Sequence, residues 1–399
     1  MTQDGRRVYL HLGSPKTGTT YLQDVLWRNQ DSLAAAGVRY PGDVPEAHFH
    51  ASMDLQGVQF QEDWFDENVP GAWARLVDDA RQWPGTVVLS HELFCTADPA
   101  AVERAVSDLA FAELHLVCTA RDLARQIPAV WQEDIKNRHV LSFAEFVAGV
   151  RGGPEPHYLS ELFWERQDLP AILRRWAAEV PAERVHVVTV PPEQPPELLW
   201  ERFCELLEID PAAFDATVER PNRSLGVAET ELVHRLNQQL DGRIDWPGHD
   251  GVVKYGIATE ILGQRSSRTP LRLPDEDREW VHERADRMVA ELIRRGYHVV
   301  GDLKELLPAP DAGGPAQPRD QAEQGEVLEV AVEALAGLAE RYAELEATAE
   351  RALGRPEAPS GVRESLRHLC EQDAALSRAY RVLAESKSAL ARIGRRNRE

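Results

Sequence analysis

Residues 13–20 carry the side chains and the spacing most suited to chemistry in this chain. They read Gly-Ser-Pro-Lys-Thr-Gly-Thr-Thr, after the apolar run Val8–Leu12 and before a segment with helical periodicity, Thr19–Ala36. Glycines allow backbone conformations in which successive amide groups turn toward one anion, and a helix N-terminus adds positive partial charge. The segment therefore predicts an anion-binding loop between a strand and a helix.

The position of the lysine narrows the chemistry of this loop. Gly13 and Gly18 have the spacing of a Walker motif, but Thr19 follows Gly18 where that motif has lysine. The lysine of the Walker motif binds phosphates, and the Ser/Thr after it binds magnesium. A magnesium-dependent ATPase or GTPase is therefore disfavoured. Lys16 is instead placed near the bridging oxygen of a bound phosphate ester, where charge develops on a leaving group.

The stretch Pro15–Leu22 resembles the 5′-phosphosulfate loop of sulfotransferases that use 3′-phosphoadenosine 5′-phosphosulfate, and weaker matches extend over residues 6–305. The resemblance implies a P-loop NTPase-like α/β fold and in-line transfer of a sulfuryl group to a hydroxyl or amine of a small molecule or glycan. The donor would be a co-substrate, and no metal is implied. Lys16 would stabilise the departing 5′-phosphate, and the loop residues bind the phosphosulfate: Ser14, Pro15, Thr17, Gly18, Thr19 and Thr20.

A second anion-binding residue, Arg121, follows the apolar run Leu114–Thr119. Open α/β sheets bind ligands at the carboxyl ends of their strands, and a guanidinium suits phosphate. Sulfotransferases place an arginine here with a serine eight residues later, and the pair binds the 3′-phosphate of the donor. This chain has Ala129 at the serine position. The side chains nearby that offer a replacement contact are Arg125, Gln126 and Lys136.

The segment Asn222–Gly226 also resembles a family segment that lies before a helix. The resemblance makes Arg223 and Ser224 further contacts of the donor phosphate. Ser224 equally suits the N-cap of the helix that follows, because a serine side chain accepts from the first free amides of a helix.

Sulfuryl transfer needs a base for the acceptor proton, and the best candidates follow the apolar run Thr86–Leu89. If the strands are parallel, residues 90–92 lie at the same edge of the sheet as residues 13–20. Glu92 is the first choice and His91 the second. The alternative is that either side chain caps a helix that begins near Leu93.

A second group of candidate bases lies in residues 46–50, Glu-Ala-His-Phe-His, which we interpret as a loop. His48 or His50 can act as the base or contact the acceptor there. With no third ligand nearby in the sequence, we expect no metal site.

Four short apolar runs predict buried strands, namely residues 7–12, 86–89, 114–119 and 184–190. Segments with helical spacing separate or follow them: residues 19–36, 71–82, 142–149, 169–180, 193–220, 229–237 and 277–295. Alternating strands and helices are typical of an α/β fold with a mostly parallel sheet flanked by helices.

We expect residues 1–306 to form this α/β domain, followed by a Pro/Gly-rich linker, 307–325, and a C-terminal helical extension, 326–399. The extension offers two amphipathic segments, residues 326–353 and 362–393, joined by a Pro/Gly break. Leu328, Leu335 and Tyr342 follow each other at heptad spacing in the first segment. A helical hairpin fits this pattern, and its apolar stripes make it a candidate surface for homo-oligomer formation.

The composition excludes several classes of protein. The 399 residues carry a formal net charge of −21, which disfavours binding of a nucleic-acid backbone. The four cysteines are far apart and form no CxxC pair, as expected for a chain in a reducing cytoplasm. No signal peptide and no apolar run of about 18 residues is present, so neither export nor membrane insertion is expected.

Two alternatives to a sulfotransferase remain at this point. A P-loop nucleotide-dependent kinase would need an aspartate at a strand end to hold magnesium, and the strand ends offer Glu92 and Asp122. A non-catalytic nucleotide-binding or scaffold protein with a degenerate sulfotransferase fold would explain Ala129, but the retained Lys16 and threonines count against it.

Overall fold

The structure is a computed structural model that describes residues 5–59, 61, 64–178, 180–192, 195, 197–217, 224–308 and 322–352. The chain divides into two compact units, Met1–Leu335 and Ala336–Glu399. The first unit contains the sheet and every described candidate site residue.

A six-stranded sheet forms the centre of the first unit, and all of its strand pairs are parallel. Its order is β2-β3-β1-β4-β5-β6. The strands are β1 (Arg7–His11), β2 (Val38–Arg39), β3 (Thr86–Ser90), β4 (Glu113–Ala120), β5 (Val185–Thr189) and β6 (His298–Val300). The prediction of an α/β fold with a parallel sheet is confirmed. The sequence pattern missed β2 and β6, because two or three residues are too short to show a period.

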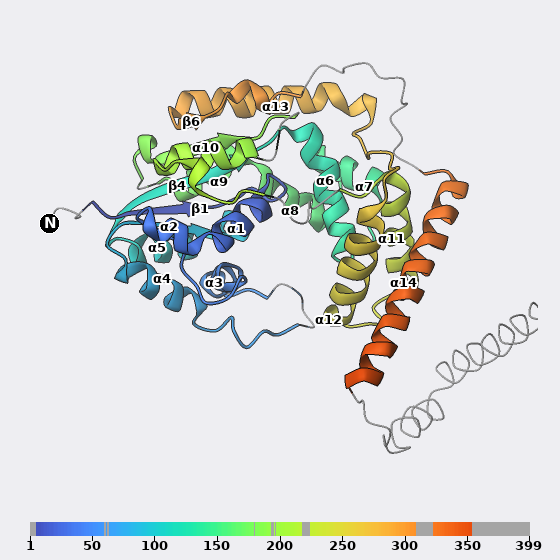
Figure 1. Ribbon diagram of the computed structural model, residues 1–399. Coiled ribbons are helices and arrows are strands. Elements are labelled where there is room, and N and C mark those ends of the chain that lie inside the picture. Colours follow the sequence, from blue (N-terminus) through green and yellow to red (C-terminus); the bar gives the residue numbers. More distant parts are fainter. Residues whose placement is uncertain are drawn as a thin grey trace, which may run out of the picture. The chain divides into compact units, whose positions relative to one another are not determined.

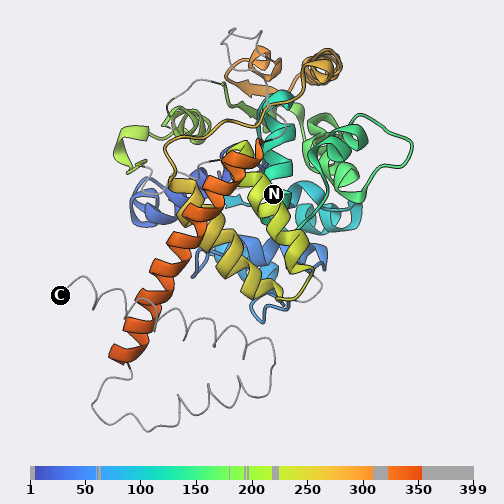
Figure 2. The same ribbon diagram turned by 90° about the vertical axis from the view of Figure 1, so that its right-hand side faces the viewer.

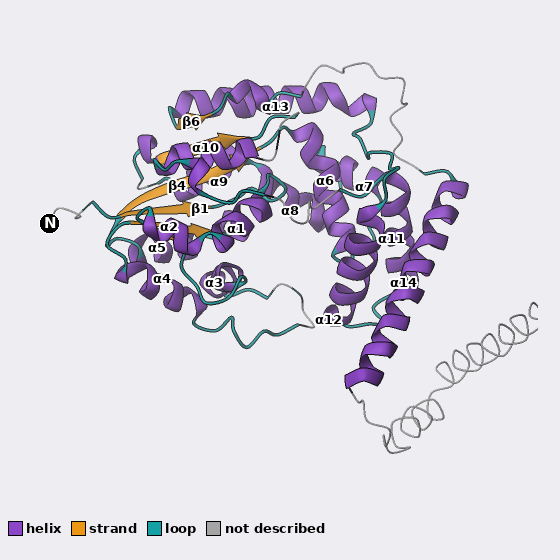
Figure 3. Ribbon diagram, viewed as in Figure 1, coloured by secondary structure: helices purple, strands orange, loops and turns teal. Residues whose placement is uncertain are grey.

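Helices cover both faces of this sheet (Figure 3). One face packs against α4 (Ala72–Gln82), α5 (Pro99–Asp108), α9 (Leu169–Trp176) and α13 (Arg278–Arg295). The other face packs against α1 (Thr19–Arg28), α2 (Gln30–Ala35) and α10 (Glu197–Leu207). Sheets buried on both faces have nearly continuous apolar strands, which explains the four runs in the sequence.

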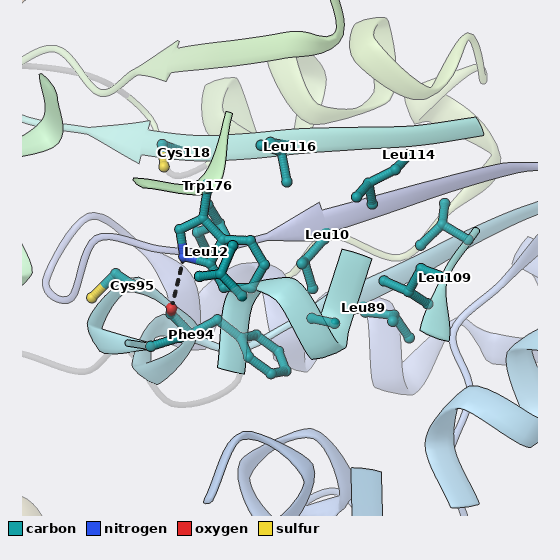
Figure 4. Close-up of a cluster of buried hydrophobic side chains, with 14 of the residues drawn as sticks. Leu10, Leu12, Leu89, Phe94, Cys95, Leu109, Leu114, Leu116, Cys118 and Trp176 are labelled. Carbon is teal, nitrogen blue, oxygen red and sulfur yellow. Dashed lines mark hydrogen bonds between the residues drawn. The ribbon is translucent and has the colours of Figure 1, made fainter. Parts of the chain in front are cut away.

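Alternation along β1 directs its side chains into two separate cores. Leu10 and Leu12 enter the first cluster with Leu89, Leu116 and Trp176 (Figure 4). In the same cluster the Trp176 indole donates to the Phe94 carbonyl at 3.1 Å, which satisfies its only polar group. Tyr9 faces the opposite cluster with Val117 and Val188.

The remaining elements of the first unit include α3 (Ala47–Gln56), η1 (Glu92–Thr96), α6 (Leu123–Lys136), α7 (Phe143–Val150) and α8 (Tyr158–Gln167). Later in the chain come α11 (Val227–Leu240), α12 (Trp246–His249), the π-helix η4 (Asp250–Ile261) and η7 (Leu303–Leu306). The helix α11 packs beside α6 and η4 (Figure 1, Figure 2). The periodicity of the sequence did not predict α3, α5, α6, α8 or η4.

Two predicted helices differ from the structure. Residues 19–36 form two helices because Asn29 ends α1. Its side-chain Nδ2 donates to the carbonyls of Val25 and Asp215, each at 2.9 Å. An Asn side chain competes with the backbone for such bonds, so it favours helix ends. The helix expected in 193–220 is confined to α10, since Pro195 precedes it and Glu208 has a φ of 59°.

The C-terminal helix α14 spans Gln324–Ala352, so Gln324 and Gly325 are helical rather than part of the linker. Its first turns belong to the first unit, where Val327, Val330 and Ala334 are buried. The first unit therefore extends beyond residue 306. The heptad residues Leu328, Leu335 and Tyr342 are exposed. The second half of the predicted hairpin, 362–393, lies outside the described residues. None of the helices in the described part of the chain is long and apolar enough to cross a bilayer.

Candidate functional site

Three strand ends meet in the middle of the sheet, where the order of the strands reverses. The chain passes from β1 to β2 and β3 on one side and then returns to β4 on the other. His11 at the end of β1 is paired with Ser90 of β3 and Val117 of β4. Residues 13–20, Glu92 and Arg121 therefore leave the sheet at one edge, as predicted, and this is where open parallel sheets bind ligands.

Backbone geometry explains the glycines of the loop 13–20. Gly13 and Gly18 have φ angles of 93° and 91°, in the left-handed region that favours glycine. A Cβ on Gly13 would lie 2.9 Å from the Glu92 Cα, and one on Gly18 would lie 2.4 Å from the Leu199 Cδ2. Gly13 thus needs glycine for conformation and for space, because the close atom belongs to the backbone. Gly18 needs it for conformation, since the end of the Leu199 side chain can move. Lys16 also has a positive φ, 65°, which places this side chain on a strained turn.

The N-terminus of α1 follows the loop directly and is suited to an anion. Its N-cap is Gly18, which supplies no side-chain hydrogen bond, and its first turn holds no acidic residue. The first amide groups of a helix have no partner within the helix, and they carry positive partial charge. Thr20, in the first turn, is exposed, so its hydroxyl is accessible at the same place.

The Thr17 hydroxyl, in contrast, faces the protein. Thr17 is buried, and its Oγ1 donates to the Ser14 carbonyl at 2.5 Å and lies 2.5 Å from the Thr119 hydroxyl. Thr119 in turn contacts His11 at 3.1 Å, and His11 contacts the Ser90 hydroxyl at 2.8 Å. Burial lowers the pKa of His11 to about 4, so the ring is neutral at physiological pH. This chain of hydrogen bonds under the loop joins the ends of three strands, and nothing in the sequence indicated it.

Glu92 lies against the loop. Its carboxylate accepts from the Gln23 amide of α1 at 3.1 Å, and its Cα is the atom that Gly13 approaches. Burial opposes ionisation, but His91 and hydrogen bonds from the Glu92 amide, Gln23 and Thr19 outweigh it and lower the pKa of Glu92. An ionised carboxylate in this position beside the loop 13–20 can accept a proton from a hydroxyl group.

His91 serves as the cap of η1. Its Nδ1 accepts from the Leu93 amide at 3.2 Å, and burial lowers its pKa. With Nδ1 accepting, the neutral ring carries its proton on Nε2, so the other nitrogen is a donor. The capping alternative therefore holds for His91, and Glu92 is the stronger candidate base.

The two histidines of the segment 46–50 do not converge. The segment is not a loop, because α3 begins at Ala47, and positions two apart on a helix point in different directions. His48 is buried and stacks on Tyr40, with its Nε2 at 2.8 Å from the Pro41 carbonyl and its Nδ1 accepting from the Ser90 amide. His50 contacts Asp66 at 3.0 Å. Both ring nitrogens of His48 are thus hydrogen-bonded to backbone groups, so His48 has a structural role.

The Lys16 ammonium binds a carboxylate that the sequence reading missed. Its Nζ donates to Glu133 Oε2 of α6 at 2.9 Å. Gln126, two turns earlier on α6, donates to the Pro15 carbonyl at 2.9 Å. The rise along the helix from Gln126 to Glu133 is about 10 Å. The Lys16 side chain therefore extends along α6 away from Pro15. No pattern pointed to Glu133, because its partner is 117 residues away in the sequence.

Arg121 has unused hydrogen-bonding capacity. Its Nη2 donates to the Arg125 carbonyl at 2.6 Å, while its buried Nε has no protein partner among the described residues. Burial and the neighbouring Arg125 lower the pKa of Arg121 to about 10, so the group is cationic at neutral pH. Arg121 lines a pocket with Ser14 and Thr17 of the loop and with residues of later elements. The loop 13–20 and Arg121 thus line the same pocket.

The expected replacements for the missing serine are mostly engaged elsewhere. Ala129 is buried within α6. Arg125 binds the Asp122 carboxylate and the carbonyls of Val190 and Pro191. Gln126 binds Pro15 and Gln167. Lys136, at the far end of α6, binds Glu133 at 2.6 Å.

The remaining predicted donor contacts are Ser224 and Arg223. Ser224 is exposed and is not the N-cap of α11, since that position belongs to Gly226. Its carbonyl accepts from Arg268 at 2.9 Å. Arg223 lies outside the described residues. Within the described ranges no group of three or more His, Cys, Asp or Glu side chains is arranged to hold a metal ion.

No protein-family model matches this chain, and no curated protein matches its sequence. Among solved structures, the fold is similar to the crystal structure of a sulfotransferase from Alicyclobacillus acidocaldarius. The alignment covers 60% of this chain and 97% of that one, with 17% identity and a TM-score of 0.35. A similarity at this level does not establish a family or an activity.

Proposed function

We propose that this chain is a sulfotransferase that transfers a sulfuryl group from 3′-phosphoadenosine 5′-phosphosulfate to a hydroxyl or amine of a small molecule or glycan. One observation carries the proposal: the N-terminus of α1, which has no side-chain cap, a cation with an unused donor (Arg121) and an ionised carboxylate (Glu92) share one edge of the sheet. Two anion sites and a base are what this reaction requires of a protein.

Each residue of the site has a separate role in binding the donor or in the transfer. The first amides of α1 and the Thr20 hydroxyl bind the 5′-phosphosulfate. Arg121 binds the 3′-phosphate with its free Nε–H. Glu92 accepts the proton of the acceptor as its oxygen or nitrogen bonds to sulfur, and the bond between sulfur and the 5′-phosphate oxygen breaks. Lys16 stabilises the charge on that oxygen after its ammonium leaves Glu133.

A kinase finds less support at this edge. The strand-end carboxylate that would hold magnesium, Asp122, accepts from the Arg125 amide at 3.0 Å and from the Arg125 Nε. It also caps α6. A carboxylate paired in this way is a poor magnesium ligand, because binding would break the cap and the ion pair.

Calorimetry tests the proposal most directly. We expect adenosine 3′,5′-bisphosphate, the product form of the donor, to bind without magnesium and more tightly than ATP with magnesium. The Lys16→Ala variant should then lose transfer of a radiolabelled sulfuryl group, while Lys304→Ala, a change of an exposed lysine on η7, should not. Tight binding of magnesium-ATP with no binding of the bisphosphate would refute the proposal.

A further inference from the structure

Two buried glutamines hold the carbonyl of Pro15, the residue before Lys16 in the loop 13–20. The Gln126 Nε2 of α6 donates to this oxygen at 2.9 Å, and the Gln167 Nε2, at the end of α8, donates to it at 3.1 Å. The Gln126 Nε2 also donates to the Gln167 Oε1 at 2.8 Å. Both acceptor positions of the Pro15 oxygen are therefore filled by side chains from two other elements.

The orientation of the Gln126 side-chain amide follows from these contacts. Its Nε2 faces two oxygens, those of Pro15 and Gln167, and the reversed amide would bring the Gln126 Oε1 against both. In the observed orientation this Oε1 is buried and has no partner among the described residues. A buried acceptor without a hydrogen bond destabilises a protein. Gln126, only 1% exposed, thus leaves its own oxygen unpaired while both of its N–H groups donate to oxygens next to the loop.

The peptide between Pro15 and Lys16 is the central peptide of a turn. Lys16 has a φ of 65°, the sign that a type II turn requires at its third residue, where glycine is usual. In a type I turn this peptide is reversed and the third residue has a negative φ, which suits a lysine. Since a positive φ strains a lysine, an outside contact has to hold the peptide in its present orientation. The two glutamines supply that contact.

The held carbonyl also determines where the Lys16 amide points. In a trans peptide the N–H and the C=O point in opposite directions. With the Pro15 oxygen directed at α6 and α8, the Lys16 N–H is directed away from them, and it has no acceptor among the described residues. Lys16 lies two residues before Gly18, the N-cap of α1. A free amide at this place adds a donor to those of the helix N-terminus.

We propose that Gln126 and Gln167 are positioning residues that act through the Pro15 carbonyl and direct the Lys16 amide at the 5′-phosphate of the donor. The role of the amide rests on the proposed function, whereas the hold of the glutamines on the turn does not. The same hold fixes the backbone from which the Lys16 side chain extends. The sequence offered Gln126 as a replacement for the serine missing at Ala129, but its contact assigns it to the 5′ end of the donor.

The hold on the turn is tested without any ligand by Lys16→Gly and Lys16→Ala, which both lack the ion pair with Glu133. With the glutamines in place, the glycine variant should have the higher midpoint of urea denaturation, because glycine adopts a positive φ without strain. In the Gln126→Met/Gln167→Met background the peptide is free to reverse and φ at position 16 becomes negative. The alanine variant should then be the more stable of the two. An advantage of glycine that persists in this background overturns the proposal.

Calorimetry tests the link to the donor. Gln126→Met and Gln167→Met keep the length of the side chain and should each weaken adenosine 3′,5′-bisphosphate and adenosine 5′-phosphate equally, about tenfold, as for one hydrogen bond to a charged group. The control is Gln132→Met, since this buried glutamine of α6 donates to the Leu225 carbonyl and the Thr230 hydroxyl instead. It should lower stability comparably and leave both affinities unchanged.

Three results would overturn the assignment to the 5′-phosphate. They are an equal loss of affinity in Gln132→Met, unchanged affinity in glutamine variants whose turn has reversed, and a loss confined to the bisphosphate, which would place Gln126 at the 3′-phosphate. If neither nucleotide binds the unaltered protein, the proposed function fails. The comparison of glycine with alanine at position 16 then still decides whether the glutamines hold the turn.

Discussion

The hydroxyl oxygens of Thr17 and Thr119 lie 2.5 Å apart, and this contact anchors the loop 13–20 to β4. Through Thr119 and His11 the anchor continues to Ser90 at the end of β3. Resemblance to the phosphosulfate loop implies that Thr17 binds the ligand, but its hydroxyl is buried and has two protein partners. We infer that Thr17 holds the shape of the loop, and that the ligand meets Thr20 and the amides of α1.

The Thr17→Val substitution tests this role. It keeps the shape of the side chain but removes the hydrogen bond to the Ser14 carbonyl and the contact with the Thr119 hydroxyl, which then keeps only His11. We therefore expect a loss of about 1–3 kcal/mol in the free energy of unfolding. Urea denaturation measures it. Thr17→Ser retains the hydroxyl and should lose much less. Unchanged stability with a loss of affinity for adenosine 3′,5′-bisphosphate would show that the hydroxyl faces the ligand instead.

Arg121→Ala should discriminate between two nucleotides. Because we place Arg121 at the 3′-phosphate, its removal should weaken adenosine 3′,5′-bisphosphate by about 10- to 100-fold, the worth of a hydrogen bond between charged groups. Affinity for adenosine 5′-phosphate should stay within about twofold, since that ligand makes no such contact. Calorimetry of both nucleotides gives the comparison. Equal losses for both would mean that Arg121 shapes the site rather than binding the 3′-phosphate.

Glu92→Gln should abolish transfer and spare binding. The amide is of the same size and still accepts from Gln23, but it cannot take a proton, so we expect kcat to fall about 10²- to 10⁴-fold. Affinity for the bisphosphate should not fall.

The pH profile of the unaltered protein separates Glu92 from a histidine base. The pKa of Glu92 is lowered, so the carboxylate is ionised throughout the neutral range and kcat should hold down to about pH 5. A decline of kcat centred near pH 6.5, together with a fully active Glu92→Gln, would point to a histidine.

The buried histidines predict loss of stability in acid. Burial lowers the pKa of His11 to about 4, and of His48 and His186 to about 3, with His115 and His298 adding to the shift at His186. In the unfolded chain each titrates near 6.5. Between these values the unfolded state binds more protons, so stability is complete above pH 6.5 and falls as the pH drops toward 3. Between pH 8 and pH 5, the protonation of each of these histidines in the unfolded state lowers the free energy of unfolding by about 2 kcal/mol.

Urea denaturation at several pH values measures this slope. His186→Gln should reduce the slope, because it removes one group whose protonation differs between the two states. Exposed His282 offers the control, and His282→Gln should leave the slope unchanged. Stability that is constant or increases on acidification would contradict the neutral, buried state of these rings.

The sequence by itself determined the α/β fold and the place of the glycine-containing loop 13–20 between β1 and α1. Strands covered on both faces must be apolar throughout, so β1, β3, β4 and β5 were visible as runs, and the parallel order then put Glu92 and Arg121 at the edge where the loop lies. The glycines at 13 and 18 were equally readable, because a positive φ leaves few other residue types.

Only the tertiary structure decided what each polar side chain does. Thr17 and Thr20 look alike in the sequence, yet one hydroxyl is buried against Thr119 and the other is exposed. The structural role of His48 followed from no pattern, since its ring is held by Tyr40 and by an amide of β3. The convergence of Lys16, Lys136 and Lys254 on Glu133 joins residues up to 238 positions apart, from Lys16 to Lys254. Local periodicity reports only which face of an element is apolar, whereas charge partners are chosen by packing between distant elements.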